Sequence, residues 1–489
     1  MLKRALVRTG FIAGLLALLV SGAIGSAFAQ EPATFATSGE ERLQTLSPDG
    51  SLIATTTNGG RELCIYSVPN ADVVSCADLT DPLIRIDPET MAWSPESDRI
   101  VFAERIAQFL VDGDLWMFDI ASGDLTNLTD DGIDASIPFA SDEEHDPYLL
   151  DFAPAWSPDG SLIAFSRTVM TGADIVPTSM MLLDVSTGEV GELALFDESM
   201  PLALPFNIEW SPSGEVIFAS AWFGPSDDAA GGVWAFDAGN GDFAQLAGPD
   251  PAYSSAPAVL AVSPAGGKVL LAYQEYIGAA FGPDRMSGYA LLDVTSGEIE
   301  PVEVSDTYVS ENAALVAPNF SPDGSALIFG VRQPAESTGF VIARDLETGD
   351  ETVLAELPEG VYPITTSATR PVQIGGSIAL VLTDPKTAIL VELPADLTDA
   401  PVIVTPETEA TPSTEIEPTA PPVFIGENAA VLREGPSADD AIVAILPPGA
   451  ELTSIGEAFE ADGHFWIEVR ANDTGDTGFV RTDFLAPVG

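Results

Sequence analysis

The chain contains very few residues of the kinds that do covalent or metal chemistry. Two histidines and two cysteines occur among 489 residues, too few for a zinc site built from several such ligands. A Ser-His-acid triad would have to use His145, in the polar segment 141–146, or His464, in a C-terminal hairpin, and neither has a candidate serine motif nearby. The Gly-x-Ser-x-Gly nucleophile elbow, phosphate loops and dinucleotide fingerprints are also missing. The sequence therefore predicts a protein that is not an enzyme.

Carboxylates are the abundant functional groups, since Asp and Glu number 75 against 18 Lys and Arg. The acidic segments 112–114, 129–132 and 142–146 could supply oxygen ligands to calcium. None of them has the twelve-residue spacing of a calcium-binding loop. We therefore expect solvated turns with no metal site and no cofactor, and calcium binding is the alternative.

Cys64 and Cys76 are expected to form a disulfide. Their midpoint lies in the turn Pro69-Asn70-Ala71, between the strand-like runs 62–68 and 72–76. A hairpin centred there places the two cysteines directly opposite one another, close enough to bridge.

Charge and the N-terminus limit where the protein works. The net charge of −57 excludes nucleic acid as a partner, because phosphate groups would be repelled. Residues 1–29 have the features of a signal peptide: a basic start, an apolar run at 11–20 and the small-x-small site Ala27-Phe28-Ala29. A retained membrane anchor is the alternative, but no second long apolar run follows. We expect export to the periplasm, cell surface or medium, with no transmembrane span after cleavage; the oligomeric state is not predicted.

A repeated turn then sets the architecture. An apolar residue followed by Ser-Pro-Asp-Gly, or a close variant, recurs with its serines 47 to 63 residues apart, at Ser47, Ser94, Ser157, Ser211, Ser263 and Ser321. An Asp…Gly turn follows 24 to 30 residues after five of these serines. Pro, Asp and Gly favour tight turns, and the runs between them are short and rich in apolar and β-branched residues. Four-stranded units at this period predict an all-β fold, a β-propeller.

Residues 91–132 resemble the TolB-type WD40-like propeller repeat, and Pro154-Ala155-Trp156-Ser157-Pro158-Asp159-Gly160 is similar again. The resemblance covers roughly residues 35–393, and the propeller domain is predicted to span 30–393. The unit at 361–393 lacks the Ser-Pro turn but keeps the strand-like runs 377–383 and 387–393. We prefer seven blades, and six is the alternative.

Two further segments follow the propeller. Residues 394–422 are rich in Pro, Thr and Glu and cannot build a core, so they are predicted to be a linker. Residues 423–489 resemble the bacterial SH3 (SH3b) domain, through Val431-Leu432-Arg433, Phe465-Trp466-Ile467 and Gly478-Phe479-Val480. The resemblance implies a small barrel that binds cell-wall peptides or proteins. Trp466 and Phe484 are either its ligand contacts or part of its core.

The propeller's topology predicts a recognition face. Ser-Pro turns and Asp…Gly turns share one face of the disc, so the longer connections 104–114, 129–151, 168–179, 221–232 and 274–288 must lie on the other. Aromatic residues on long loops over a rigid scaffold favour binding, although they could instead cap the blades. These ligand-binding candidates are Phe109, Tyr148, Trp222, Phe223, Tyr276, Phe281 and Arg285.

Together these patterns predict an exported, non-catalytic binding protein. Its propeller would recognise a protein, peptide or glycan, and its SH3-like module would bind cell wall or a second partner. The alternative is a propeller-type lyase or hydrolase that uses acidic loop residues and a divalent cation.

Overall fold

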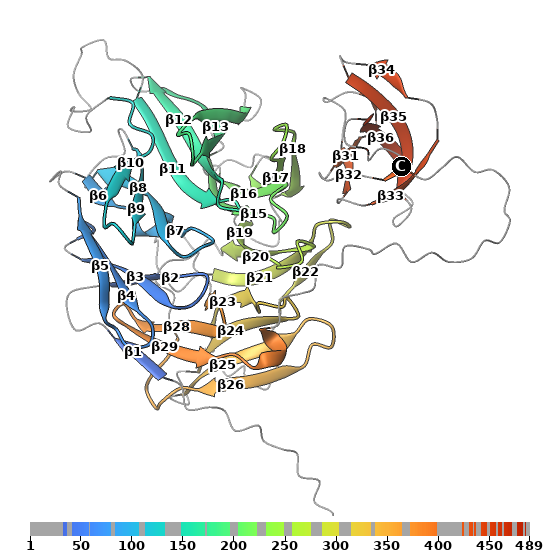
Figure 1. Ribbon diagram of the computed structural model, residues 1–489. Helices are drawn as coiled ribbons and strands as arrows, with labels where there is room; N and C mark the ends of the chain where they lie inside the picture. The colour runs from blue at the N-terminus through green and yellow to red at the C-terminus, as the bar shows by residue number, and fades with distance from the viewer. Residues whose placement is uncertain are drawn as a thin grey trace, which may run out of the picture.

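The structure is a computed structural model of the 489-residue chain (Figure 1). In the propeller it describes residues 33–36, 42–57, 59–79, 84–106, 113–132, 148–171, 174–195, 204–222, 231–248, 257–274, 286–302, 314–333, 338–363 and 372–398. In the C-terminal part it describes 423–424, 430–433, 435–436, 442–446, 450–455, 458–461, 464–471, 477–482 and 485. The predicted signal peptide lies outside the described residues.

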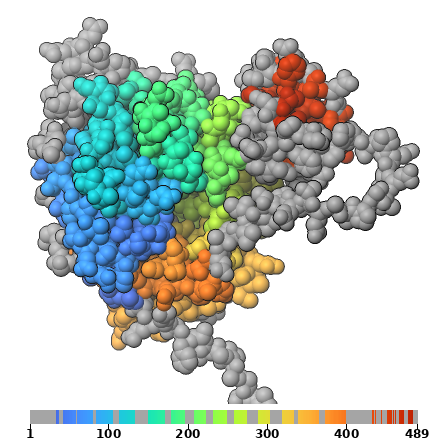
Figure 2. Space-filling view, viewed as in Figure 1, coloured from blue at the N-terminus to red at the C-terminus, as the bar shows by residue number. Residues whose placement is uncertain are grey.

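Seven antiparallel sheets form the blades of a propeller, six with four strands and one with five. They follow one another in chain order, from blue to orange (Figures 1 and 2). Blade 1 is β2(Arg42–Leu46), β3(Leu52–Thr57), β4(Glu62–Ser67) and β5(Val73–Asp78). Blade 2 is β6(Ile84–Ile86), β7(Ala92–Trp93), β8(Arg99–Ile106), β9(Leu115–Asp119) and β10(Leu125–Asn127), with the short helix η1(Pro88–Thr90) between its first two strands. Blade 3 is β11(Tyr148–Trp156), β12(Leu162–Thr171), β13(Asp174–Asp184) and β14(Val190–Leu195).

The remaining blades repeat the same order. Blade 4 is β15(Leu204–Trp210), β16(Val216–Trp222), β17(Gly232–Asp237) and β18(Phe243–Ala247). Blade 5 is β19(Ala258–Val262), β20(Lys268–Gln274), β21(Met286–Asp293) and β22(Ile299–Pro301). Blade 6 is β23(Ala314–Phe320), β24(Ala326–Gln333), β25(Thr338–Asp345) and β26(Glu351–Glu356). Blade 7 is β27(Gln373–Gly375), β28(Ile378–Asp384), β29(Thr387–Glu392) and, from the N-terminus, β1(Ala33–Ala36).

The ring is closed by the two ends of the propeller segment. Strand β1 pairs antiparallel with β29, from Ala33 opposite Leu390 to Ala36 opposite Thr387. The seventh blade, preferred on the sequence, is thus confirmed, and its outermost strand precedes blade 1 in the chain. The sequence-based count did not anticipate this exchange.

The Ser-Pro turns are held by their own side chains. In blade 3 the buried hydroxyl of Ser157 accepts a hydrogen bond from the amide of Leu162 (2.9 Å) and donates one to Asp159 (2.7 Å). The glycine that follows has a positive φ and its amide donates to the carbonyl of Ser157. The same pattern recurs at Ser47 and Ser321. A turn predicted from sequence is therefore confirmed in its hydrogen bonds.

The core lies between the blades. Each hydrophobic cluster of the propeller joins the facing sides of neighbouring sheets, as where Phe236 of blade 4 packs in one cluster with Met180 of blade 3. Both side chains are fully buried. Because no single sheet could bury both of its faces, each blade depends on its neighbours.

Two segments differ from the sequence-based expectation. Residues 168–179 were expected to be a loop, but strands β12 and β13 continue through most of this stretch, with Thr168 opposite Thr178. Residues 394–398 were assigned to the linker, but the short helix η3(Ala395–Leu397) contacts blade 6, where the carbonyl of Leu397 accepts from the amide of Asp323. Local hydrogen bonds thus extend the propeller at both places.

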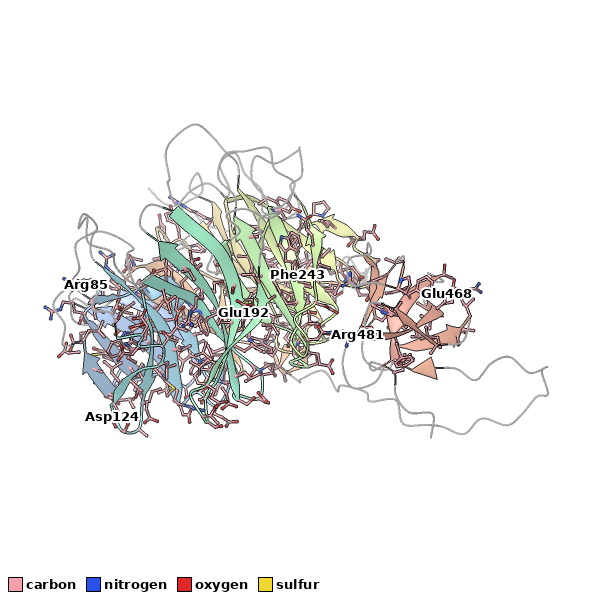
Figure 3. The ribbon with its side chains drawn as sticks, turned by 90° about the horizontal axis from the view of Figure 1, so that it is seen from above. Arg85, Asp124, Glu192, Phe243, Glu468 and Arg481 are labelled. Atoms are coloured by element: carbon pink, nitrogen blue, oxygen red, sulfur yellow. A yellow bond between two sulfur atoms is a disulfide. The ribbon has the colours of Figure 1, made fainter. Side chains whose placement is uncertain are left out.

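The C-terminal part is a separate seven-stranded sheet, curved in Figure 1. Its strands are β30(Val423–Phe424), β31(Ala430–Arg433), β32(Ile442–Leu446), β33(Glu451–Ser454), β34(Phe459–Ala461), β35(His464–Ala471) and β36(Thr477–Arg481). It lies beside blade 4 (Figures 1 and 3), and Arg481 attracts the Asp237 carboxylate there.

In the part of the chain that the structure describes, no helix has the length and apolar character needed to cross a membrane.

Candidate functional site: the central channel

A channel of about 820 Å³ runs along the axis of the propeller. Each blade contributes one strand from the edge of its sheet to the wall: β2, β7, β11, β15, β19, β23 and β27. Its volume lies within the range of about 300–1,000 Å³ that is usual for ligand pockets. The seven-blade architecture therefore produces one cavity to which all blades contribute.

One sequence position in each repeat lines this channel. It is the residue two places before the serine of each Ser-Pro turn, and it is occupied by Thr45, Ala92, Ala155, Glu209, Ala261 and Asn319. Most of these side chains are small and all but one are uncharged. Glu209 alone brings a carboxylate to this ring of positions.

Bulges in the first strands set the orientation of this position. The register between β15 and β16 shifts between Phe206 and Glu209, and Asn207 adopts a φ of 49°. A comparable shift occurs in β11, where Ala153 has a φ of 53°. A bulge re-aims the side chains that follow it. In blade 4 the result is that Glu209 is exposed in the lumen while its neighbours Ile208 and Trp210 are buried.

Indole and amide groups tie neighbouring blades together around the channel. Three tryptophans donate to a carbonyl of the preceding blade: Trp93 to Thr45, Trp156 to Ala92 and Trp210 to Ala155, over 3.3, 3.1 and 3.1 Å. Side-chain amides donate in the other direction, to a carbonyl of the following blade: Asn207 to Val259, Asn319 to Val372 and Gln373 to Gln44, over 3.2, 2.9 and 2.8 Å. The channel wall is thus held in place by hydrogen bonds between blades, and these polar groups already have partners.

Glu209 differs from them. Its carboxylate has no hydrogen bond or ion pair with any described residue. The side chain is exposed toward the channel, and the loss of bulk water among the surrounding blades raises its pKa to about 7. A charged carboxylate without a hydrogen-bond or ion-pair partner in a cavity lowers the stability of the folded protein. Glu209 is therefore a candidate functional group.

The other charged groups of the channel wall are acidic as well. Asp87, Glu89 and Glu104 line it on the blade 2 side. Glu104 is buried and accepts a hydrogen bond from the indole of Trp116, and Asp87 accepts one from the amide of Glu89. Among the described residues of the wall there is no Lys, Arg or His. The lumen is therefore electronegative.

A second acidic cluster lies at the seam between blades 2 and 3. The Asp151 side chain is 1% exposed and forms a bidentate pair with Arg167, at 2.7 Å to Nε and 2.6 Å to Nη2. Asp114 accepts from Asn127 at 2.7 Å, and burial raises its pKa to about 6. Asp114 was expected in a solvated turn; it is buried instead, because its neighbours supply hydrogen bonds. The absence of a cofactor stays a prediction, with calcium binding as its alternative.

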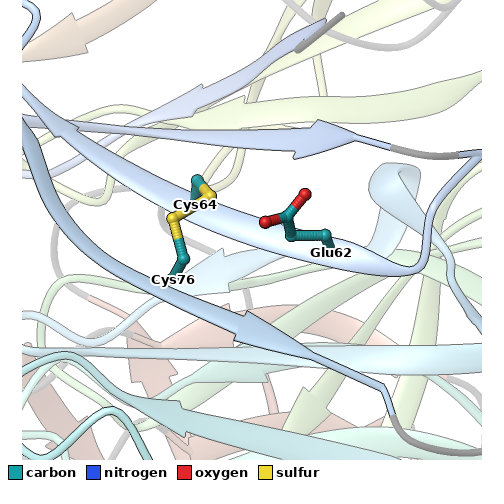
Figure 4. A group of neighbouring side chains, drawn as sticks. All are labelled: Glu62, Cys64 and Cys76. Carbon is teal, nitrogen blue, oxygen red and sulfur yellow. A yellow bond between two sulfur atoms is a disulfide. The ribbon is translucent and has the colours of Figure 1, made fainter.

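The predicted disulfide is present between Cys64 and Cys76, which lie directly opposite on β4 and β5 (Figure 4). Glu62 lies close to both sulfur atoms. Among the described residues this is the one group of three or more His, Cys, Asp or Glu side chains close enough together to share a metal ion. Both sulfur atoms are bonded to each other, so the group acts here as a covalent link between two strands.

The aromatic candidates of the long connections are only partly described. Phe109, Phe223, Tyr276, Phe281, Arg285 and Phe484 lie outside the described residues, as does His145. The backbone of Tyr148 begins β11 and that of Trp222 ends β16, so both belong to strand ends rather than to loops. Trp466 is 1% exposed and its indole donates to Ala461, as a core residue would. Binding by the other aromatic residues stays a prediction.

Glu209 was missed by the sequence analysis, although a signal for it existed. Aligning the six Ser-Pro turns shows a single charged residue in the column two places before the serine. That column faces the channel only because the preceding residues bulge, and a bulge has no clear sequence signature outside glycine.

No family model matches the chain, and no curated protein matches it in sequence. Solved structures with a similar fold include TolB from Acinetobacter baumannii, at 18% identity and a TM-score of 0.35, covering 66% of this chain and 65% of TolB. The Cps50 (Swd1) β-propeller domain of Myceliophteria thermophila is 10% identical, with a TM-score of 0.45 and coverage of 75% and 99%. An oligogalacturonate lyase in complex with manganese is 12% identical, with a TM-score of 0.38 and coverage of 75% and 99%. The chain thus spans slightly less than two thirds of the TolB structure.

Proposed function

We propose that this chain is an exported, non-catalytic binding protein whose propeller holds part of a protein, peptide or cell-wall glycan at the central channel and the long-connection face around it. The observation that carries the proposal is the channel of about 820 Å³, to which all seven blades contribute. A cavity of this size with apolar walls and a few polar groups has the composition of a binding site.

The distribution of polar groups supports binding rather than catalysis. Asn207, Asn319 and Gln373 are used to join blades, and the buried Asp151 is neutralised by Arg167. The enzyme alternative requires converging acids that share a cation, and the described wall residues offer Glu209 on one side and the blade 2 carboxylates on the other.

We further propose that the propeller is related to the TolB-type repeat proteins and that the C-terminal sheet is a bacterial SH3-like module with a second binding role. Order and spacing of its strand motifs support this assignment. Phe465 on β35 is 58% exposed, unlike its buried neighbour Trp466, and offers an aromatic contact surface.

Filling the channel tests the proposal. Ala261 lines the lumen, and Ala265 lies four residues later in the exposed Ser-Pro turn of the same blade. Ala261→Phe should abolish capture of partners from an envelope extract, whereas Ala265→Phe should leave capture unchanged. Both variants should show the same circular dichroism spectrum and melting temperature within a few degrees. Equal capture by the two folded variants would contradict a channel site.

A further inference from the structure

The channel has a charge pattern that specifies one class of ligand. Its described wall carries four carboxylates, Asp87, Glu89, Glu104 and Glu209, and no basic side chain. Asp87 and Glu104 accept hydrogen bonds from the protein, and Glu89 is an exposed residue of the short helix η1. Glu209 projects into the lumen from blade 4, on a strand whose other wall residues are uncharged. A ligand that supplies a positive charge would complement this acidic wall and give the Glu209 carboxylate a counter-ion.

A metal ion does not fit the surroundings of Glu209. Calcium takes six to eight oxygen ligands and magnesium requires an octahedron. The equivalent wall positions of the two adjacent blades are Ala155 and Ala261, which have no side-chain oxygen. Glu209 also belongs to no group of three or more ligating side chains among the described residues.

An organic cation fits both the carboxylate of Glu209 and the apolar surface of the channel wall. An ammonium or guanidinium group needs one carboxylate as its counter-ion, and its carbon stem packs against apolar surface. Along the channel wall of blades 3 to 5, apolar surface is supplied by Ala155 and Ala261 together with the largely buried Trp156, Trp210 and Leu260. The channel volume of about 820 Å³ is large enough to hold a side chain of this kind together with a short piece of backbone.

We propose that the channel binds an organic cation, a primary ammonium or guanidinium group on an apolar stem, and that Glu209 is its counter-ion. The inference rests on the proposed function and adds the chemical class of the ligand. The group could be a lysine or arginine side chain of an inserted peptide or a free amine, and these two sources share one chemistry.

Calorimetric titration of the chain after removal of residues 1–29 tests this. The probes are acetyl-Gly-Lys-Gly-amide, in which the side chain is the only charge, n-pentylamine as the free amine, and acetyl-Gly-norleucine-Gly-amide as the neutral match. The variants are Glu209→Gln and, as a matched control, Glu300→Gln, an exposed glutamate on the outermost strand of blade 5. Both variants change the net charge equally.

We expect the lysine peptide to bind at least tenfold more tightly than the norleucine peptide. Glu209→Gln should remove that preference, and Glu300→Gln should keep it. Wild-type affinity should rise between pH 5.5 and pH 8, as Glu209 loses its proton, and the affinity of Glu209→Gln should not. Binding of n-pentylamine would show that a free amine suffices, and binding of the peptide alone would identify a peptide as the source.

Two results would overturn the inference. Equal binding of the lysine and norleucine peptides would show that the positive charge of the ligand does not contribute to affinity. Equal affinity of Glu209→Gln and Glu300→Gln for the lysine peptide would show that Glu209 is not its counter-ion. If no probe binds while Ala261→Phe still abolishes partner capture, the cation is wrong and the binding function stands. If Ala261→Phe has no effect either, both proposals fail.

Discussion

The exposed carboxylates of the Ser-Pro and Asp…Gly turns and the carboxylates enclosed by the blades have opposite electrostatics. Asp237 begins an Asp…Gly turn but is buried, and burial raises its pKa, so it belongs with the enclosed group. In the turns, the backbone amides of Ser161 and Thr348 donate to Asp159 and Asp345 and hold their pKa below the usual range. Inside, burial raises the pKa of Asp114, Asp151 and Glu209. Turn carboxylates therefore stabilise the fold in their charged form, whereas the enclosed carboxylates cost stability when charged. Residues kept at such a cost are the ones to suspect of function.

We expect the largest loss of stability from replacing Arg167, whose positive charge pairs with the buried Asp151. Arg167→Met leaves Asp151 charged and buried without its bidentate partner, so we expect a loss of about 3–5 kcal/mol in the free energy of unfolding. Lys268→Met, which removes an exposed ion pair with Asp293, should cost less than about 1 kcal/mol. Urea unfolding at pH 7.5 measures the free energy of unfolding of both variants. Similar losses for Arg167→Met and Lys268→Met would contradict the proposed difference between buried and exposed ion pairs.

Removing an enclosed charge should stabilise the protein. The folded pKa of Asp114, about 6, lies above its ordinary value of 3.8, so its charge costs nothing below pH 3.8 and its full amount above pH 6. Asp114→Asn can still accept a hydrogen bond from Asn127, and we expect it to gain up to about 2–3 kcal/mol at pH 7.5. The gain should vanish by pH 4. A loss of stability at pH 7.5 would show that the charged form is needed.

Removing a turn carboxylate, in contrast, should destabilise the protein at neutral pH. Asp159 accepts from the Ser161 amide at 3.0 Å and from the Ser157 hydroxyl at 2.7 Å. Asp159→Ala should therefore lose about 1 kcal/mol at pH 7.5. Because its folded pKa is lowered, this contribution is present above pH 3.8 and disappears as the pH falls through the folded value. Thermal unfolding at pH 7.5 and pH 3 measures the difference, and an unchanged melting temperature at pH 7.5 would contradict the role of the turn.

Much of the fold could be predicted because its turns have sequence signatures. The Ser-Pro-Asp-Gly recurrence located the blades, and the hairpin symmetry around Asn70 paired Cys64 with Cys76. Strand β1 was not found, because four residues at the N-terminal edge of a repeat array carry no turn of their own and pair with a strand more than 350 residues away.

The site was harder to predict than the fold. The long connections attracted attention because they hold aromatics, yet Tyr148 and Trp222 belong to strand ends. Glu209 lies in a strand beside a tryptophan, where a hydrophobic pattern predicts only a wall position. Its meaning depends on bulges and on seven strands meeting at one axis, which a single repeat does not reveal.

The smallest expected effect is the change in melting temperature when the propeller and the C-terminal sheet are separated. Limited proteolysis should cut first between residues 399 and 422, beyond the short helix η3 that contacts blade 6. Each fragment should then melt at nearly its temperature in the whole protein, because the electrostatic attraction between Arg481 and Asp237 adds little. Differential scanning calorimetry of the fragments and the whole chain checks this. A melting temperature that falls by more than about 5 °C on separation would indicate a docked pair of domains.

Site-specific photo-cross-linking tests the channel claim most directly. We would place p-benzoylphenylalanine at Glu89, which is exposed and lines the channel, and separately at Glu300, which is exposed on the outer edge of blade 5. The proposed function predicts a discrete cross-linked partner from the producing cell's envelope at position 89 and none at position 300, with the product lost when Ala261→Phe is added. A partner cross-linked from position 300, or one from position 89 that survives Ala261→Phe, would contradict binding in the channel.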